Sequence, residues 1–135
     1  MTDHAHFYFY FHLHFPKTID LEEIAAKLDI EAETSFLYHE PLRKNGNDPG
    51  VTILYKSDII TDRLINPFLE DYVLLVFPKL LDNLDYLKEL NCEIRFDIVL
   101  YETLEEDIGV AVPKEIIYIL SQLDADLDIS KYLLD

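Results

Sequence analysis

The chain has 135 residues, half of them hydrophobic, and its 27 acidic side chains against 11 basic ones give a formal net charge of -16 at pH 7. Length and apolar content predict one folded domain over residues 1–135, while the charge argues against nucleic acid and anionic membranes as partners, because both would repel it. No apolar run is long enough to span a membrane and no basic signal-peptide start is present, so we expect a cytoplasmic protein.

Residues 4 to 15, HAHFYFYFHLHF, carry the sharpest local pattern, because apolar residues occupy every odd position and His or Tyr every even position. This period of two predicts a long strand whose odd-numbered side chains form the core and whose even-numbered face is amphipathic. Pro16 is expected to end the pairing of this strand.

The next part of the chain alternates between helical and extended patterns. We expect a helix over 20–29, a short strand over 35–39, a turn-rich connection over 41–50 and a strand over 51–57. Either Asp20 or Thr18 is suited to cap the helix, because a short polar side chain can accept a hydrogen bond from its first free N–H groups. The strand over 51–57 is predicted to return antiparallel to the first strand.

Helical spacing resumes over 63–91, where two helices, or one helix bent at Pro78, fit equally well. The remaining expected elements are a strand over 92–102, a short strand over 108–112, a helix from Pro113 to Leu123 and a strand over 126–132. The resulting order, β-α-β-β-α-β-β-α-β, predicts a single α+β domain with a largely antiparallel mixed sheet of about five or six strands and helices packed on one face. The residues expected to be buried are Phe7, Phe9, Phe11, Leu13, Phe96, Ile98, Leu127 and Ile129.

The first strand followed by DLEEIAAKLDIEAE, and the closing run IGVAVPKEIIYILSQLDADLDISKY, resemble the opening and the end of a bacterial family known as domain of unknown function 4279. The resemblance spans nearly the whole chain and consists mainly of hydrophobic spacing. Tyr55 stands where the family commonly has Trp, and Asp29 and Ala32 stand where Gly and Pro are common. The resemblance implies a bacterial protein and supplies neither an activity nor a catalytic residue.

Two His-x-His pairs, His4/His6 and His12/His14, share one face of the first predicted strand. Side chains two residues apart on a strand are roughly 6 to 7 Å from each other, so one pair could share a zinc ion. The two pairs are too far apart to share one ion, and neither has an evident set of further ligands. We therefore expect polar residues on a non-core face and no bound metal or other cofactor.

Other patterns that carry chemistry are incomplete. Asp124, Asp126 and Asp128 have the spacing of calcium-loop ligands, but Ile129 stands where such a loop requires glycine. Cys92, the single cysteine, is expected to be a buried, inert thiol, and it excludes a disulfide between two residues of this sequence. Neither a Gly-x-Ser-x-Gly nor a phosphate-binding glycine motif occurs, so we expect no catalytic residues.

The strong negative charge, together with the lack of a catalytic motif, favours a non-catalytic acidic protein-binding module. An immunity protein that inhibits a basic toxin is an example of this type. The residues expected to bind the basic partner are Tyr8, Tyr10, His12, His14, Glu102, Glu105, Glu106 and Asp107. The alternative is a small-ligand or metal-binding protein, including an enzyme, that uses the His/Tyr face of the first strand. Homodimerisation through that same face is a third hypothesis.

Overall fold

The computed structural model describes residues 4–16, 20–29, 35–39, 51–62 and 64–134. The predicted connection over 41–50, the alternative helix cap Thr18 and the family position Ala32 lie outside these ranges. In chain order the elements are β1 (His6–Phe15), α1 (Leu21–Leu28), β2 (Ser35–His39), β3 (Val51–Lys56), α2 (Asn66–Asp82), α3 (Leu84–Glu89), β4 (Glu93–Glu102), α4 (Lys114–Gln122) and β5 (Asp126–Leu133).

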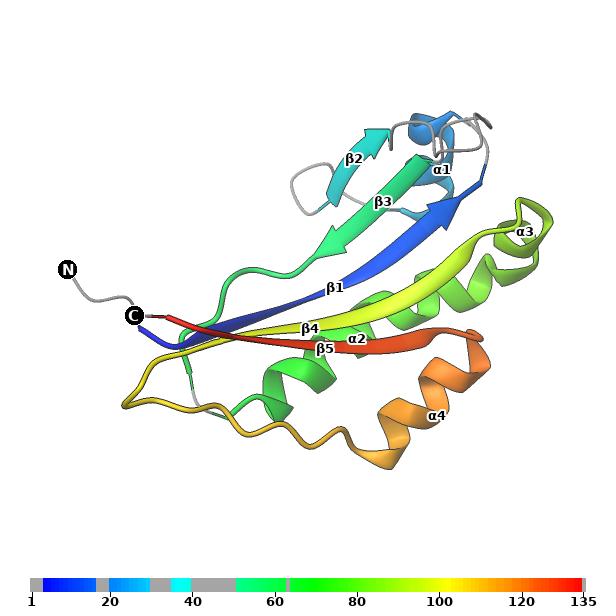
Figure 1. Ribbon diagram of the computed structural model, residues 1–135. Coiled ribbons are helices and arrows are strands. Elements are labelled where there is room, and N and C mark those ends of the chain that lie inside the picture. The colour runs from blue at the N-terminus through cyan, green and yellow to red at the C-terminus, as the bar shows by residue number, and fades with distance from the viewer. Residues whose placement is uncertain (1–3, 17–19, 30–34, 40–50, 63, 135) are drawn as a thin grey trace.

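The strands form one open mixed sheet in the order β2-β3-β1-β4-β5 (Figure 1). β1 pairs antiparallel with both β3 and β4, and β4 pairs parallel with β5. The predicted α+β class with a largely antiparallel mixed sheet is therefore confirmed. None of the helices in the described ranges is long and apolar enough to cross a membrane.

The central strand β1 follows the predicted alternation over its whole length. Its odd-numbered side chains, Phe7, Phe9, Phe11, Leu13 and Phe15, are all 0% exposed. Its even-numbered side chains are only half-buried. The core therefore lies on the odd face of β1, where Phe96 of β4 packs against Phe9 and Phe11 with ring centroids 6.2 and 4.9 Å away.

A tyrosine from α2 reaches into the sheet between β1 and β3. The Phe11 N–H donates a hydrogen bond to the Tyr72 hydroxyl over 3.0 Å, and that hydroxyl donates to the Tyr55 carbonyl. Phe11 and Tyr55 are partners in the β1–β3 register, so the hydroxyl bridges two backbone groups of facing residues. This contact joins α2 to the centre of the sheet through a buried polar atom.

Helix α1 begins as predicted from Asp20, whose carboxylate accepts hydrogen bonds from the Glu22 and Glu23 N–H groups at 3.0 and 3.3 Å. Its buried residues Ile24 and Leu28 belong to the common core. The Lys79 ammonium of α2 donates to the carbonyl of Asp29 over 2.7 Å. These contacts place α1 on the same side of the sheet as α2, as predicted for helices packed on one face.

The helical region over 63–91 does divide in two, but not at Pro78, which lies inside α2. Proline removes the hydrogen bond that residue 78 would donate to the carbonyl of Leu74, and both residues are exposed, so water can serve that carbonyl. The helix instead ends at Asn83, whose N–H donates to the Leu80 carbonyl over 3.2 Å and whose side-chain amide donates to the Lys79 carbonyl over 2.8 Å. Two helices therefore form, as one of the predicted alternatives has it, but the boundary lies at Asn83 rather than at Pro78.

Two further predictions near the C-terminal end need correction. The short strand expected over 108–112 is irregular backbone, so the predicted element order is wrong there and the described residues form no sixth strand. Ile129 was expected in the core and is 45% exposed, while Leu127 is only half-buried. Among the described residues β5 is an edge strand with a neighbour on one side only, so no described outer strand covers its side chains.

Candidate binding surface

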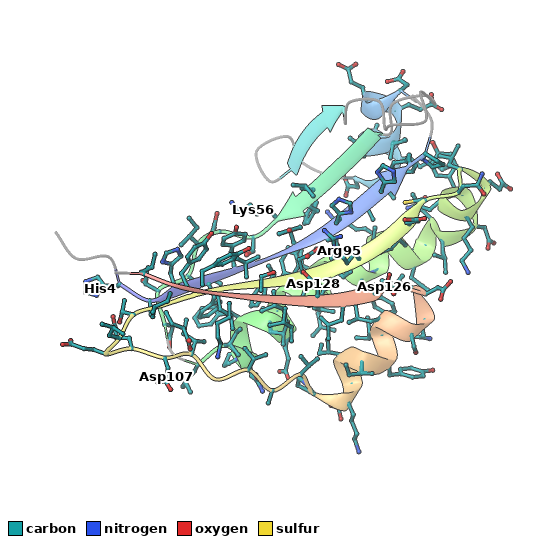
Figure 2. All side chains as sticks on the ribbon, viewed as in Figure 1. His4, Lys56, Arg95, Asp107, Asp126 and Asp128 are labelled. Carbon is teal, nitrogen blue, oxygen red and sulfur yellow. The ribbon has the colours of Figure 1, made fainter. Side chains whose placement is uncertain are left out.

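The helices of the described ranges lie on one side of the sheet, and we call the opposite side the open face. It is defined by the even-numbered side chains of β1 and by the residues in register with them on the neighbouring strands (Figures 1 and 2). The members with described side chains are His6, Tyr8, Tyr10, His12 and His14 of β1, Leu54 and Lys56 of β3, Glu93, Arg95, Asp97, Val99 and Tyr101 of β4, and Asp126, Asp128, Ser130 and Tyr132 of β5.

Five aromatic side chains of the open face form a contiguous stack, which we call the aromatic row. The ring centroids are 4.7 Å apart for His6 and Tyr101, 5.1 Å for Tyr101 and Tyr132, 6.5 Å for Tyr8 and Tyr101, and 6.2 Å for Tyr8 and Tyr10. The row crosses β1, β4 and β5 because these residues are paired in the strand registers. Tyr132 is 50% exposed, whereas the other four members are half-buried.

The Tyr8 and Tyr10 phenols of the aromatic row are neutral at physiological pH. Burial, together with the neighbouring Tyr101, raises the pKa of Tyr8 to about 12. Burial and the carboxylate of Asp97 also raise the pKa of Tyr10. The Lys56 ammonium lies 4.2 Å from the centre of the Tyr8 ring, so one ring of the row already contacts a cation.

An ion pair occupies the middle of the open face. Arg95 Nε lies 3.1 and 2.9 Å from the two carboxylate oxygens of Asp97, whose residue is only 2% exposed. Burial raises the pKa of Asp97 despite the opposing effect of this guanidinium, and the nearby Asp128 raises it further. The pair therefore presents a partly exposed guanidinium above a covered carboxylate, with Asp128 beside it on β5.

The histidine pairs do not assemble a metal site in the part of the chain that the structure describes. The His12 and His14 rings are stacked with centroids 6.3 Å apart, and both residues are half-buried. The Nδ1 atom of His4 instead lies 3.6 Å from Oε1 of Glu106. No group of three or more His, Cys, Asp or Glu side chains among the described residues is placed to hold a metal ion.

The acidic segment after β4 contains two kinds of carboxylate. Glu102 accepts a hydrogen bond from the Ile108 N–H over 2.6 Å and lies 3.4 Å from the Lys131 ammonium. Glu106 accepts from the Ala5 N–H over 3.3 Å. Both are half-buried and hold the segment in place, whereas Glu105 and Asp107 are exposed.

The predicted partner-binding residues therefore lie in three places. Tyr8 and Tyr10 belong to the aromatic row, and the acidic segment lies at the end of the sheet where β1 begins and β4 ends; Figure 2 shows His4 and Asp107 at that end. His12 and His14 lie at the other end of β1, opposite Arg95 and Glu93. The tyrosines lie between these two groups along the open face, with Tyr10 two residues from His12 on β1.

Sequence reasoning missed Tyr101, Tyr132 and the Arg95–Asp97 pair as members of this surface. The alternation over 92–102 places residues 95, 97 and 101 on the polar side of their strand, and that parity was an available signal. Parity does not predict the strand register, and it is the register that stacks Tyr101 against His6 and Tyr132.

Cys92 and the aspartates of β5 do not form a reactive or ligand-binding site in the described part of the chain. Burial raises the pKa of the half-buried Cys92 thiol to about 12, so it is a weak nucleophile at neutral pH. Asp126 and Asp128 lie in the extended strand β5 rather than in a loop that could wrap around calcium.

Comparison of the chain with protein-family models, with curated proteins and with solved structures finds no match. The resemblance to the domain of unknown function 4279 family thus stays a prediction.

Proposed function

We propose that this chain is a non-catalytic protein-binding module whose open face receives a basic protein, in the manner of an immunity protein that masks a toxin. The observation that carries the proposal is the aromatic row, a stack of five partly accessible rings on the side of the sheet without helices. Bacterial origin and a cytoplasmic location belong to this proposal as expectations.

The aromatic row has the chemistry of an interface centre. Tyrosine supplies a large contact area with few rotatable bonds, and it is enriched among the residues that dominate binding energy. The strand registers already hold the rings in place, so little conformational entropy is lost when a partner covers them. The contact between Lys56 and Tyr8 indicates that these rings can accept a cationic side chain of a partner.

The charge of the chain supports a basic rather than an acidic partner. A net charge of -16 attracts a cationic protein over distances of about a Debye length and repels anionic competitors. The exposed Asp107 lies at the end of the sheet where β1 begins (Figure 2), and the exposed Glu105 is two residues before it in the same segment. We therefore assign the carboxylates to association and the aromatic rings to retention of the bound partner.

The test begins with capture of partners at low salt from the source cell, followed by association and dissociation kinetics with the captured basic protein. Tyr8→Ala and Tyr132→Ala are expected to raise the dissociation rate by about tenfold or more while changing the association rate little. Tyr118→Ala is the matched control, because Tyr118 is 64% exposed on α4, on the other side of the sheet.

Charge reversal tests the second half of the proposal. Glu105→Lys with Asp107→Lys is expected to slow association, and the effect should shrink as salt is raised. Glu70→Lys with Asp71→Lys on α2 gives the same change in net charge at exposed positions away from the open face, and it should slow association less. Binding that ignores salt, or that responds equally to Tyr118→Ala and Tyr8→Ala, contradicts the proposal.

A further inference from the structure

The outer edge of β5 is a strand edge without a partner among the described residues. β5 is the last strand in the sheet order, and its register with β4 is continuous from Asp126 to Leu133. It contains neither a proline nor a bulge in that register, which are two devices that natural proteins use to block an edge. A lysine can also block an edge, but the ammonium of Lys131, the single lysine of β5, lies 3.4 Å from the Glu102 carboxylate of β4.

The hydrogen bonding of β5 shows which backbone groups this edge offers. The Leu134 N–H, just beyond the strand, donates to the Glu102 carbonyl of β4 over 2.6 Å. Backbone groups of successive residues in a strand point to opposite edges, so the even-numbered residues of β5 face β4. The residues that direct their N–H and C=O groups outward are Leu127, Ile129, Lys131 and Leu133.

The side chains on the two sides of β5 differ in chemistry. On the open face, Asp126 and Asp128 are exposed and followed by Ser130 and Tyr132, the last of these in the aromatic row. Figure 2 shows Asp126 and Asp128 along β5, next to Arg95 on β4. On the helix side, Ile129 and Leu133 are 45% and 59% exposed although their parity is that of the core.

We propose that the outer edge of β5 receives an extended segment of the basic partner as an added strand, in which basic side chains alternate with apolar ones. The basic side chains lie over Asp126, Asp128 and Tyr132, and the apolar ones cover Ile129 and Leu133. Main-chain hydrogen bonds supply affinity in this mode, and the alternating side chains supply specificity. A second copy of this chain fits less well, because it would bring the same acidic residues and another charge of -16 to the edge.

This inference rests on the proposed function only for the charge of the partner. A defined peptide can test it without any captured protein. The probe is a capped peptide of eight residues, the length of β5, in which arginine and valine alternate. A scrambled peptide of the same composition is the control for charge alone, and it should bind about tenfold or more weakly because its arginines no longer share one face.

Backbone methylation of the peptide distinguishes strand addition from electrostatic contact. In one peptide the arginine amides are N-methylated, and in the other the valine amides are. In an added strand only one of these two sets of N–H groups faces β5, so one methylated peptide should lose binding by about tenfold or more and the other should keep it. The identity of the surviving peptide also reports whether the added strand is parallel or antiparallel. Equal effects of the two methylation patterns overturn the proposal.

Variants of the chain test the same edge from the other side. Ile129→Pro removes an outward N–H group without removing a bond to β4, and it should weaken peptide binding. Asp126→Asn with Asp128→Asn should also weaken peptide binding. Glu70→Gln with Asp71→Asn on α2 removes the same amount of negative charge and should have a smaller effect.

 A proline at residue 129 can also disturb the strand, so circular dichroism and the thermal midpoint of each variant are measured in parallel.

The outcomes for this edge and for the open face can be told apart. If Tyr8→Ala weakens binding of the captured protein but the alternating peptide does not bind, the edge inference fails and the proposed function stands. If the peptide binds in the expected manner but the tyrosine variants have no effect on the captured protein, the edge inference stands and the proposed function fails. Sedimentation that shows a dimer abolished by Ile129→Pro assigns the edge to a second copy and overturns the inference.

Discussion

β4 and β5 lie side by side in the same register and have similar alternating sequences, yet their side chains end up in different environments. Ile98 and Ile129 are register partners with the same chemistry, on the same side of the sheet. Ile98 is 0% exposed and Ile129 is 45% exposed. Parity thus selects the face of the sheet to which a side chain points, whereas the position of the strand within the sheet decides how deeply that side chain is buried.

The physical reason is the number of neighbours. β4 lies between β1 and β5, so its inward side chains are enclosed from both sides as well as by the helices. β5 has β4 on one side and no described strand on the other. Burial in β4 stabilises the fold, and the exposed apolar side chains of β5 remain available to a partner.

The largest expected effect is on the free energy of unfolding when the register partners Ile98 and Ile129 are each shortened to alanine. Ile98→Ala should lower the free energy of unfolding by about 2 to 5 kcal/mol, because it removes fully buried methyl groups and leaves a cavity. Ile129→Ala should lower it by less than about 1 kcal/mol, since water already reaches the side chain. Denaturant unfolding of both variants measures the difference, and equal losses would mean that the edge is as well packed as the centre.

A smaller effect is expected where α2 enters the centre of the sheet. Tyr72→Phe deletes the hydroxyl that bridges the Phe11 N–H and the Tyr55 carbonyl, so two buried backbone groups lose their partner. The expected loss is about 1 to 3 kcal/mol in the free energy of unfolding, with faster hydrogen exchange at the Phe11 amide. Tyr118→Phe is the control, because that tyrosine is exposed on α4. Unchanged exchange at Phe11 would show that β1 and β3 close the gap with a direct bond.

The smallest effect is a dependence on pH that separates a covered carboxylate in β4 from an exposed one in β5. Burial raises the pKa of Asp97 above its ordinary value, so the folded protein binds this proton more tightly than the unfolded chain does. The free energy of unfolding should therefore fall as pH rises from the ordinary carboxyl value through the raised one, and then level off.

Asp97→Asn should remove this part of the decline, so the variant gains on the wild type as pH rises across that window. Asp126→Asn is the matched control, because Asp126 is exposed on β5. Unfolding free energies of the three proteins at several pH values provide the measurement. A difference between wild type and Asp97→Asn that does not vary with pH would contradict the raised pKa.

The sequence predicted much of the local structure because local structure has local causes. The strict alternation over residues 4 to 15 identified β1 and its buried face, and Asp20 identified the start of α1. Pro78 misled the prediction because a proline on the exposed side of a helix removes a hydrogen bond that water can replace. The apolar pattern over 108–112 was read as a strand, although no described strand pairs with it.

The candidate site could be predicted only in part. Tyr8 and Tyr10 were identified from the parity of one strand, and the acidic segment from its charge. Tyr101, Tyr132 and the Arg95–Asp97 pair were not, because their proximity to the tyrosines of β1 arises from strand pairing across the chain. Of the predicted carboxylates, Glu102 and Glu106 turned out to be held by backbone N–H groups, a role that composition cannot reveal.

The sequence alone indicates which residues of each strand share a face, two candidate caps for the start of α1, and the acidic character of the chain. These properties follow from side-chain period, capping chemistry and ionisation, all of which act within a few residues. Only the tertiary structure decided that β4 lies inside the sheet and β5 at its edge, and that His6, Tyr101 and Tyr132 stack in one row. Strand order depends on how distant segments cover one another, so the same alternating pattern yields a buried Ile98 and an exposed Ile129.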